Sequence, residues 1–103
     1  MSNSKNAGPC RRDEELYFKV RESLERLLDL AHLVLDRAEE KKQRRAAAIA
    51  RHVASETSIL IEQLAAWQPE DRICYDEFIS RIRRHYSVLR AAAKRLGVEL
   101  PRV

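Results

Sequence analysis

The chain has 103 residues, which suits a single domain, and 45% of them are hydrophobic and 35% charged. With only two glycines and three prolines it has too few turn residues for a typical sheet protein, so the composition favours packed helices. It contains no apolar run of roughly 18 residues and no signal-peptide core, so we expect a cytoplasmic protein that neither spans nor binds a membrane.

Two cysteines, Cys10 and Cys74, lie far apart and form neither a CxxC motif nor a zinc-ligand spacing with histidine. We therefore expect reduced thiols and no disulfide. Cys74 falls near the start of a predicted helix, where both a reactive thiol and a partly buried structural one are open interpretations.

The polar arm of residues 1–11 contains Gly8 and Pro9 and is predicted to be disordered. A single helical domain is predicted over residues 12–100. Its first helix, residues 12–40, begins with Asp13 and two glutamates, which suit the positive end of the helix dipole. Apolar residues then recur at three- and four-residue steps over a broad arc, which predicts packing against two neighbours. The main stripe consists of Leu16, Val20, Leu24, Leu27, Ala31, Val34 and Ala38.

Residues 39–45 read EEKKQRR and contain no residue that ends a helix, so two arrangements are open. A turn at residues 40–43 gives three helices of similar length. One continuous helix over residues 13–67 would be far longer than usual and would have to dimerise to bury its apolar side. We favour the turn.

The second predicted helix covers residues 44–67 and ends before Pro69, because the residue preceding a proline avoids helical geometry. Three large apolar residues on the first two helices point away from the predicted core. They are Phe18, Leu33 and Ile59, and together they form a candidate protein interface.

The third predicted helix covers residues 69–96, with Pro69 at its first position and Gly97 closing it in a left-handed conformation. No acidic residue occurs from Phe78 to Val98, so this helix concentrates the basicity of a chain whose net charge is only +4. Its basic residues are Arg81, Arg83, Arg84, Arg90, Lys94 and Arg95, a candidate surface for nucleic acid or an acidic partner. Val98 and Leu100 are expected to fold back on the helix, and residues 101–103 to fray.

We expect an all-α fold, a three-helix antiparallel (up-down-up) bundle, possibly dimeric. Phosphate-binding glycine loops and nucleophile motifs are absent from the sequence, and the polar strip around His32 faces outward, so we predict no catalytic residues, no cofactor and no metal. The function we infer is a non-enzymatic interaction or regulatory module that binds a protein partner or itself as a homodimer. The alternative is a nucleic-acid-binding regulator that uses the basic third helix.

Overall fold

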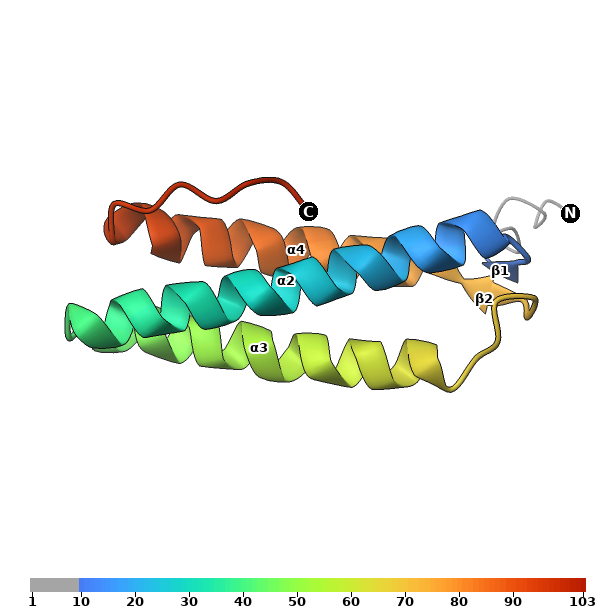
Figure 1. The fold of residues 1–103 in the computed structure, drawn as a ribbon, viewed down its shortest axis with the longest axis horizontal. Helices are drawn as coiled ribbons and strands as arrows, with labels where there is room; N and C mark the ends of the chain where they lie inside the picture. The colour runs from blue at the N-terminus through green and yellow to red at the C-terminus, as the bar shows by residue number, and fades with distance from the viewer. Residues whose placement is uncertain (1–9) are drawn as a thin grey trace, which may run out of the picture.

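The computed structural model describes residues 10–103. Three helices, α2 (Glu14–Glu40), α3 (Arg44–Ala65) and α4 (Tyr75–Arg95), lie side by side in a body of 52 × 26 × 19 Å (Figure 1). α2 and α4 run in one direction and α3 runs in the other, which confirms the predicted all-α up-down-up bundle. A two-stranded antiparallel sheet of β1 (Cys10–Arg11) and β2 (Ile73–Cys74) closes one end, a feature the sequence did not indicate.

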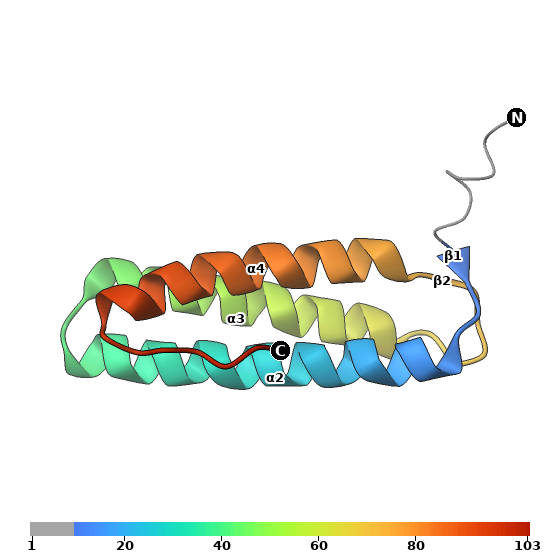
Figure 2. The ribbon, with the colours of Figure 1, turned by 90° about the horizontal axis from the view of Figure 1, so that it is seen from above.

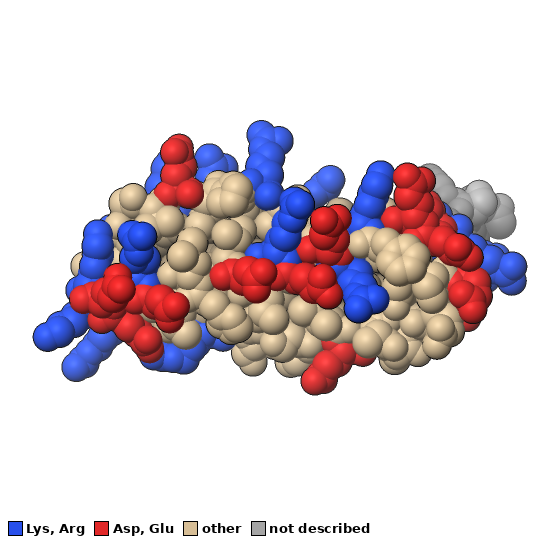
Figure 3. Space-filling model, in the orientation of Figure 1, with Lys and Arg blue, Asp and Glu red and all other residues tan. Residues whose placement is uncertain are grey.

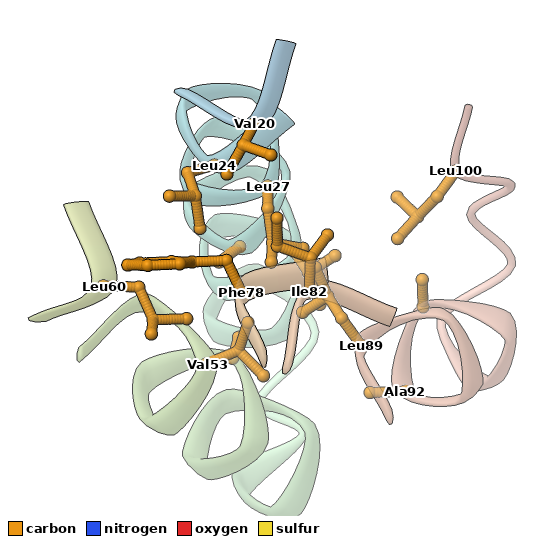
Figure 4. Close-up of a cluster of buried hydrophobic side chains, with 14 of the residues drawn as sticks. Val20, Leu24, Leu27, Val53, Leu60, Phe78, Ile82, Leu89, Ala92 and Leu100 are labelled. Atoms are coloured by element: carbon orange, nitrogen blue, oxygen red, sulfur yellow. The ribbon is translucent and has the colours of Figure 1, made fainter. Parts of the chain in front are cut away.

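The core runs along the whole bundle and includes six of the seven residues of the stripe predicted on the first helix; Leu16 is only half-buried, and Tyr17, which the stripe omitted, is buried. Leu24 of α2, Val53 of α3 and Leu89 of α4 are fully buried, and Figure 4 shows the ring of Phe78 extending between Leu24 and Leu60. Each such side chain contributes roughly 1.5–3 kcal/mol by leaving water. Burial of three amphipathic faces in one shared core therefore holds the helices together.

The favoured turn between the first two helices is confirmed. α2 ends at Glu40, Lys42 adopts a left-handed φ of 56°, and the Gln43 N–H donates to the Ala38 carbonyl at 2.8 Å. This bond is the six-to-one closure that usually has glycine in the left-handed position. Because the turn contains no glycine, the pairing of the α2 and α3 apolar faces, and not local preference, decides that the chain reverses here.

The predicted start of the third helix at Pro69 is wrong, because α4 begins six residues later at Tyr75. Residues 68–71 form a turn in which the Asp71 N–H donates to the Gln68 carbonyl at 3.0 Å, and the Asp71 carboxylate accepts from the Gln68 N–H at 2.8 Å. Proline is as suitable at the second position of such a turn as at the first position of a helix. Pro69, which predicted the start of a helix, therefore belongs to a turn.

The expectation of two reduced thiols is also wrong, because Cys10 and Cys74 form a disulfide. The antiparallel register places Cys10 opposite Cys74 and Arg11 opposite Ile73, so the two sulfurs meet although 64 residues separate them in the sequence. Spacing along the chain carries no information about such a contact. Of the arm predicted to be disordered, residues 1–9 lie outside the described residues, and the remaining two form β1.

Gly97 closes α4 with a φ of +76°, as predicted. Beyond it, the C-terminal segment, defined here as residues 98–103, runs back along the bundle over the side where α4 adjoins α2 (Figure 2). Leu100 is buried and Val103 packs against the core, so the expected folding back is confirmed, whereas the expected fraying at residues 101–103 is not seen.

Candidate interaction surface

The six basic residues singled out in the sequence are all exposed on α4, and we call them the basic face of α4. Arg81 forms an ion pair with Glu77 at 3.6 Å, and within residues 10–103 the other five have no ion-pair partner. The helix carries six basic and two acidic residues, a net charge of +4. Its cationic side chains are therefore open to an external anion.

The outer side of α2 is organised differently. It carries eight acidic and four basic residues, a net charge of −4, and every one of its basic residues forms an ion pair within the helix. Arg21 and Glu25, for example, approach to 3.4 Å at a four-residue spacing. Figure 3 shows acidic side chains across the middle of the molecule, over α2, and basic side chains along the edge that α4 and the C-terminal segment form.

A groove of about 870 Å³ opens between α2, α4 and the C-terminal segment. Its floor is apolar and comes from both helices, whereas its rim is predominantly cationic. The floor includes Leu16, Val20, Ile79 and Ile82, and the rim includes Lys19, Arg83, Arg90 and Arg102, with Glu99 as its one acidic residue. The sequence analysis selected Arg83 and Arg90 among the basic residues of this helix but did not predict the groove, because the C-terminal segment forms one wall of it.

The Tyr86 hydroxyl holds the C-terminal segment against this groove. It lies 3.2 Å from the Leu100 carbonyl and 2.9 Å from the Pro101 carbonyl, so it donates its proton between these two acceptors. At the far end of α4, the Lys41 ammonium donates to the Leu96 carbonyl at 2.8 Å. The loop between α2 and α3 is thereby tied to the point where the C-terminal segment begins.

The three apolar residues predicted to form an interface are all exposed. Phe18, Leu33 and Ile59 are 52%, 42% and 45% exposed. Phe18 lines a notch together with Trp67, which is 44% exposed and which sequence reasoning did not select. Leu33 and Ile59 do not line this notch, and an interface that includes all three residues stays a prediction.

Two titratable groups have shifted pKa values, and neither lines the groove. Burial raises the pKa of the Tyr75 phenol, and the nearby Asp13 carboxylate adds to the effect. Burial lowers the pKa of the His85 imidazole, whose ring centre lies 6.2 Å from that of His52. Both shifts arise chiefly from burial within the packed bundle.

Within residues 10–103 the structure places no group of three or more His, Cys, Asp or Glu side chains where they can hold a metal ion. None of the helices in this part of the chain has the length and apolar character needed to cross a membrane. The chain matches no family model, no curated protein and no solved structure.

Proposed function

We propose that this protein is a non-enzymatic helical interaction module that binds an acidic protein partner through the basic face of α4. The supporting observation is the contrast in ion pairing, since five of the six cations on α4 have no ion-pair partner among residues 10–103. A surface with an uncompensated charge attracts the opposite charge, which speeds association and selects the matching partner.

A second copy of the chain fits this description of a partner. The net charge of −4 on α2 complements the net charge of +4 on α4, so a homodimer can pair the two helices of neighbouring copies. Light scattering at low and high salt tests this case. A dimer that dissociates into monomers as salt screens the charges supports it, and a monomer at low salt rejects it.

Nucleic acid is the second candidate ligand, and one observation favours it. Ser80, Ser87 and Ala91 are small and exposed between the basic flanks of α4, so the centre of the face is low and its edges are cationic. Such a surface suits a phosphate backbone, to which arginine, lysine and serine all donate hydrogen bonds. Affinity for DNA would fall by about 0.9 log units per log unit of salt for each phosphate neutralised.

The experiment compares two fluorescent probes, a polyglutamate chain and a DNA duplex, binding to the protein and to two charge-reversed variants. The first variant changes four unpaired cations of α4, by Arg83→Glu, Arg84→Glu, Arg90→Glu and Lys94→Glu. The control variant changes four exposed, ion-paired arginines to glutamate elsewhere, at Arg21, Arg26, Arg37 and Arg51.

We expect polyglutamate to bind, and the α4 variant to lose at least about tenfold more affinity than the control variant. Binding of the duplex in preference to polyglutamate, with the steep salt dependence given above, would transfer the function to the nucleic-acid candidate. Equal losses in the two variants would show that only net charge matters, and would remove the basic face of α4 from the mechanism.

The cytoplasmic location expected from the sequence is a separate proposal, and the disulfide argues against it. Disulfides persist in oxidising compartments and are rare where glutathione and thioredoxin keep thiols reduced. Alkylation of Cys10 and Cys74 in intact cells, followed by mass spectrometry, tests the location. Two alkylated thiols support a reducing cytoplasm, and unmodified cysteines support an oxidising compartment.

A further inference from the structure

We infer that the groove between α2 and α4 receives an extended peptide segment with alternating apolar and acidic side chains, in place of the chain's own C-terminal segment. This inference rests on the proposed function and names the chemistry of the partner. Its starting point is that an extended stretch of chain, residues 98–103, already lies against α2 and α4 as one wall of the groove, with Leu100 buried to 8% exposure.

The C-terminal segment is held loosely enough to be replaced. Its attachments beyond Val98 are the two hydrogen bonds from Tyr86 and the burial of Leu100 and Val103, and no ion pair holds it within the described residues. The hydroxyl of Tyr86 can donate in the same way to the carbonyls of any other extended chain. An incoming peptide with an apolar side chain in the position of Leu100 would therefore recover the same contacts.

The C-terminal segment supplies apolar side chains to the floor of the groove but does not neutralise the cations of its rim. Its charged side chains are Glu99 and Arg102, which cancel, and Arg102 adds a further cation to a rim that already contains Arg83 and Arg90. An acidic peptide would replace this like-charge neighbour with carboxylates. The mismatch between the bound segment and the rim favours an acidic partner over the segment itself.

The spacing of the rim cations indicates several carboxylates on the ligand. Arg83 and Arg90 are seven residues apart on one helix, roughly 10 Å along its axis at 1.5 Å per residue. In an extended peptide every second side chain points the same way, about 6.6 Å apart. Leucines directed at the floor therefore leave acidic side chains within reach of both arginines, whereas a fatty acid offers the two arginines a single carboxylate.

The test measures fluorescence anisotropy of a labelled eight-residue peptide in which leucine alternates with glutamate, and of a control peptide with lysine in place of glutamate. The groove variant is Arg83→Glu with Arg90→Glu. The matched variant is Arg84→Glu with Arg95→Glu, which makes the same change of charge on residues of α4 that do not line the groove.

We expect the acidic peptide to bind and the lysine peptide not to bind. The groove variant should lose about tenfold in affinity, and the matched variant no more than about twofold. Equal losses in the two variants would overturn the groove while leaving the basic face of α4, and so the proposed function, in place. Displacement of the peptide by oleate as efficient as by unlabelled peptide would assign the groove to fatty acids and overturn the inference.

Two further variants test the competition with the C-terminal segment in the full chain. Tyr86→Phe removes the two hydrogen bonds to the segment but keeps the ring, and Leu100→Ala removes its anchor. If the segment occupies the peptide site, Leu100→Ala should raise peptide affinity by at least about threefold by mass action. Tyr86→Phe should change the peptide affinity less, because it removes a hydrogen-bond donor that both the segment and the peptide would use. Unchanged or lower affinity in Leu100→Ala would overturn the replacement.

Discussion

α2 and α4 bury their apolar sides in the same core, yet they differ in the charge on their outer sides. On α2 every basic side chain has a carboxylate three or four residues away, and the helix has a net charge of −4. On α4 the two carboxylates lie in the first turn, only Arg81 is paired within residues 10–103, and the net charge is +4. Exposed pairs of this kind contribute about 0–1 kcal/mol, so neither pattern is needed for folding.

This difference in outer charge distinguishes the features that folding of the bundle requires from those that it does not constrain. Each helix must supply an apolar stripe to the shared core, and both helices do so. Packing of the core does not require any particular charge on the outer sides of the helices. The stability of the bundle therefore does not explain the row of cations on α4. The following predictions test whether the two helices are alike in the core and differ only at their ends and surfaces.

The largest effect is expected in the core. Leu24→Ala on α2 and Leu89→Ala on α4 should each lower the free energy of unfolding by about 2–5 kcal/mol, because both side chains are fully buried and each leaves a cavity. Urea denaturation measures the loss. Leu33→Ala, at a 42% exposed position of α2, serves as the control and should change stability by less than about 0.5 kcal/mol. A small loss at only one of the two leucines would show that the helices do not share the core equally.

The next effect concerns the start of α4, which depends on the disulfide. Replacing both cysteines, by Cys10→Ser with Cys74→Ser, should cost about 2–4 kcal/mol, because the bond closes a loop of 64 residues in the unfolded chain. Guanidinium denaturation with and without reductant measures it. Reductant should destabilise the wild type to the level of the variant and leave the variant unchanged. Identical transitions for the oxidised wild type and the variant would contradict a stabilising link.

The start of α2 depends instead on a side-chain cap. The Asp13 carboxylate accepts a hydrogen bond from the Leu16 N–H at 3.0 Å, whereas Cys74 at the corresponding position of α4 makes no side-chain cap bond. Asp13→Ala should therefore cost about 1 kcal/mol, and Asp13→Asn should recover most of it. Thermal unfolding followed by circular dichroism measures both variants. No recovery in the asparagine variant would assign the loss to charge and not to the cap.

The smallest expected effect is a pH dependence of stability that arises from His85 on α4. Burial lowers the pKa of His85 below its ordinary value of 6.5; Glu56 opposes the shift, while His52, Arg84 and Arg81 add to it. The unfolded chain then binds a proton more readily than the folded one, so stability should decrease as the pH falls below about 6.5. Urea titrations between about pH 7.5 and 5.5 measure the slope, which should flatten in His85→Gln. An unchanged slope in this variant would place the titrating group elsewhere.

The apolar stripes could be predicted because a period of 3.6 residues directly records which side of a helix is buried. Val20, Leu27 and Val34 were assigned to the core from spacing alone, and all three are buried. The cations of α4 were predictable for a related reason, since six basic residues on a long helix cannot all point inward. The groove was not predictable, because one of its walls, residues 98–103, comes from chain with no periodic pattern.

The sequence by itself determined three amphipathic helices, their approximate ends and the basic character of the last one, because these properties are local and repeat along the chain. Tertiary structure alone decided that Cys10 meets Cys74, that Pro69 belongs to a turn, and that the C-terminal segment forms one wall of a groove with α2 and α4. The turn at Pro69 is local, but proline suits both a turn and a helix start, whereas the disulfide and the groove depend on residues brought together from distant parts of the chain. Such contacts form only when the helices pack, and no spacing in the sequence records them.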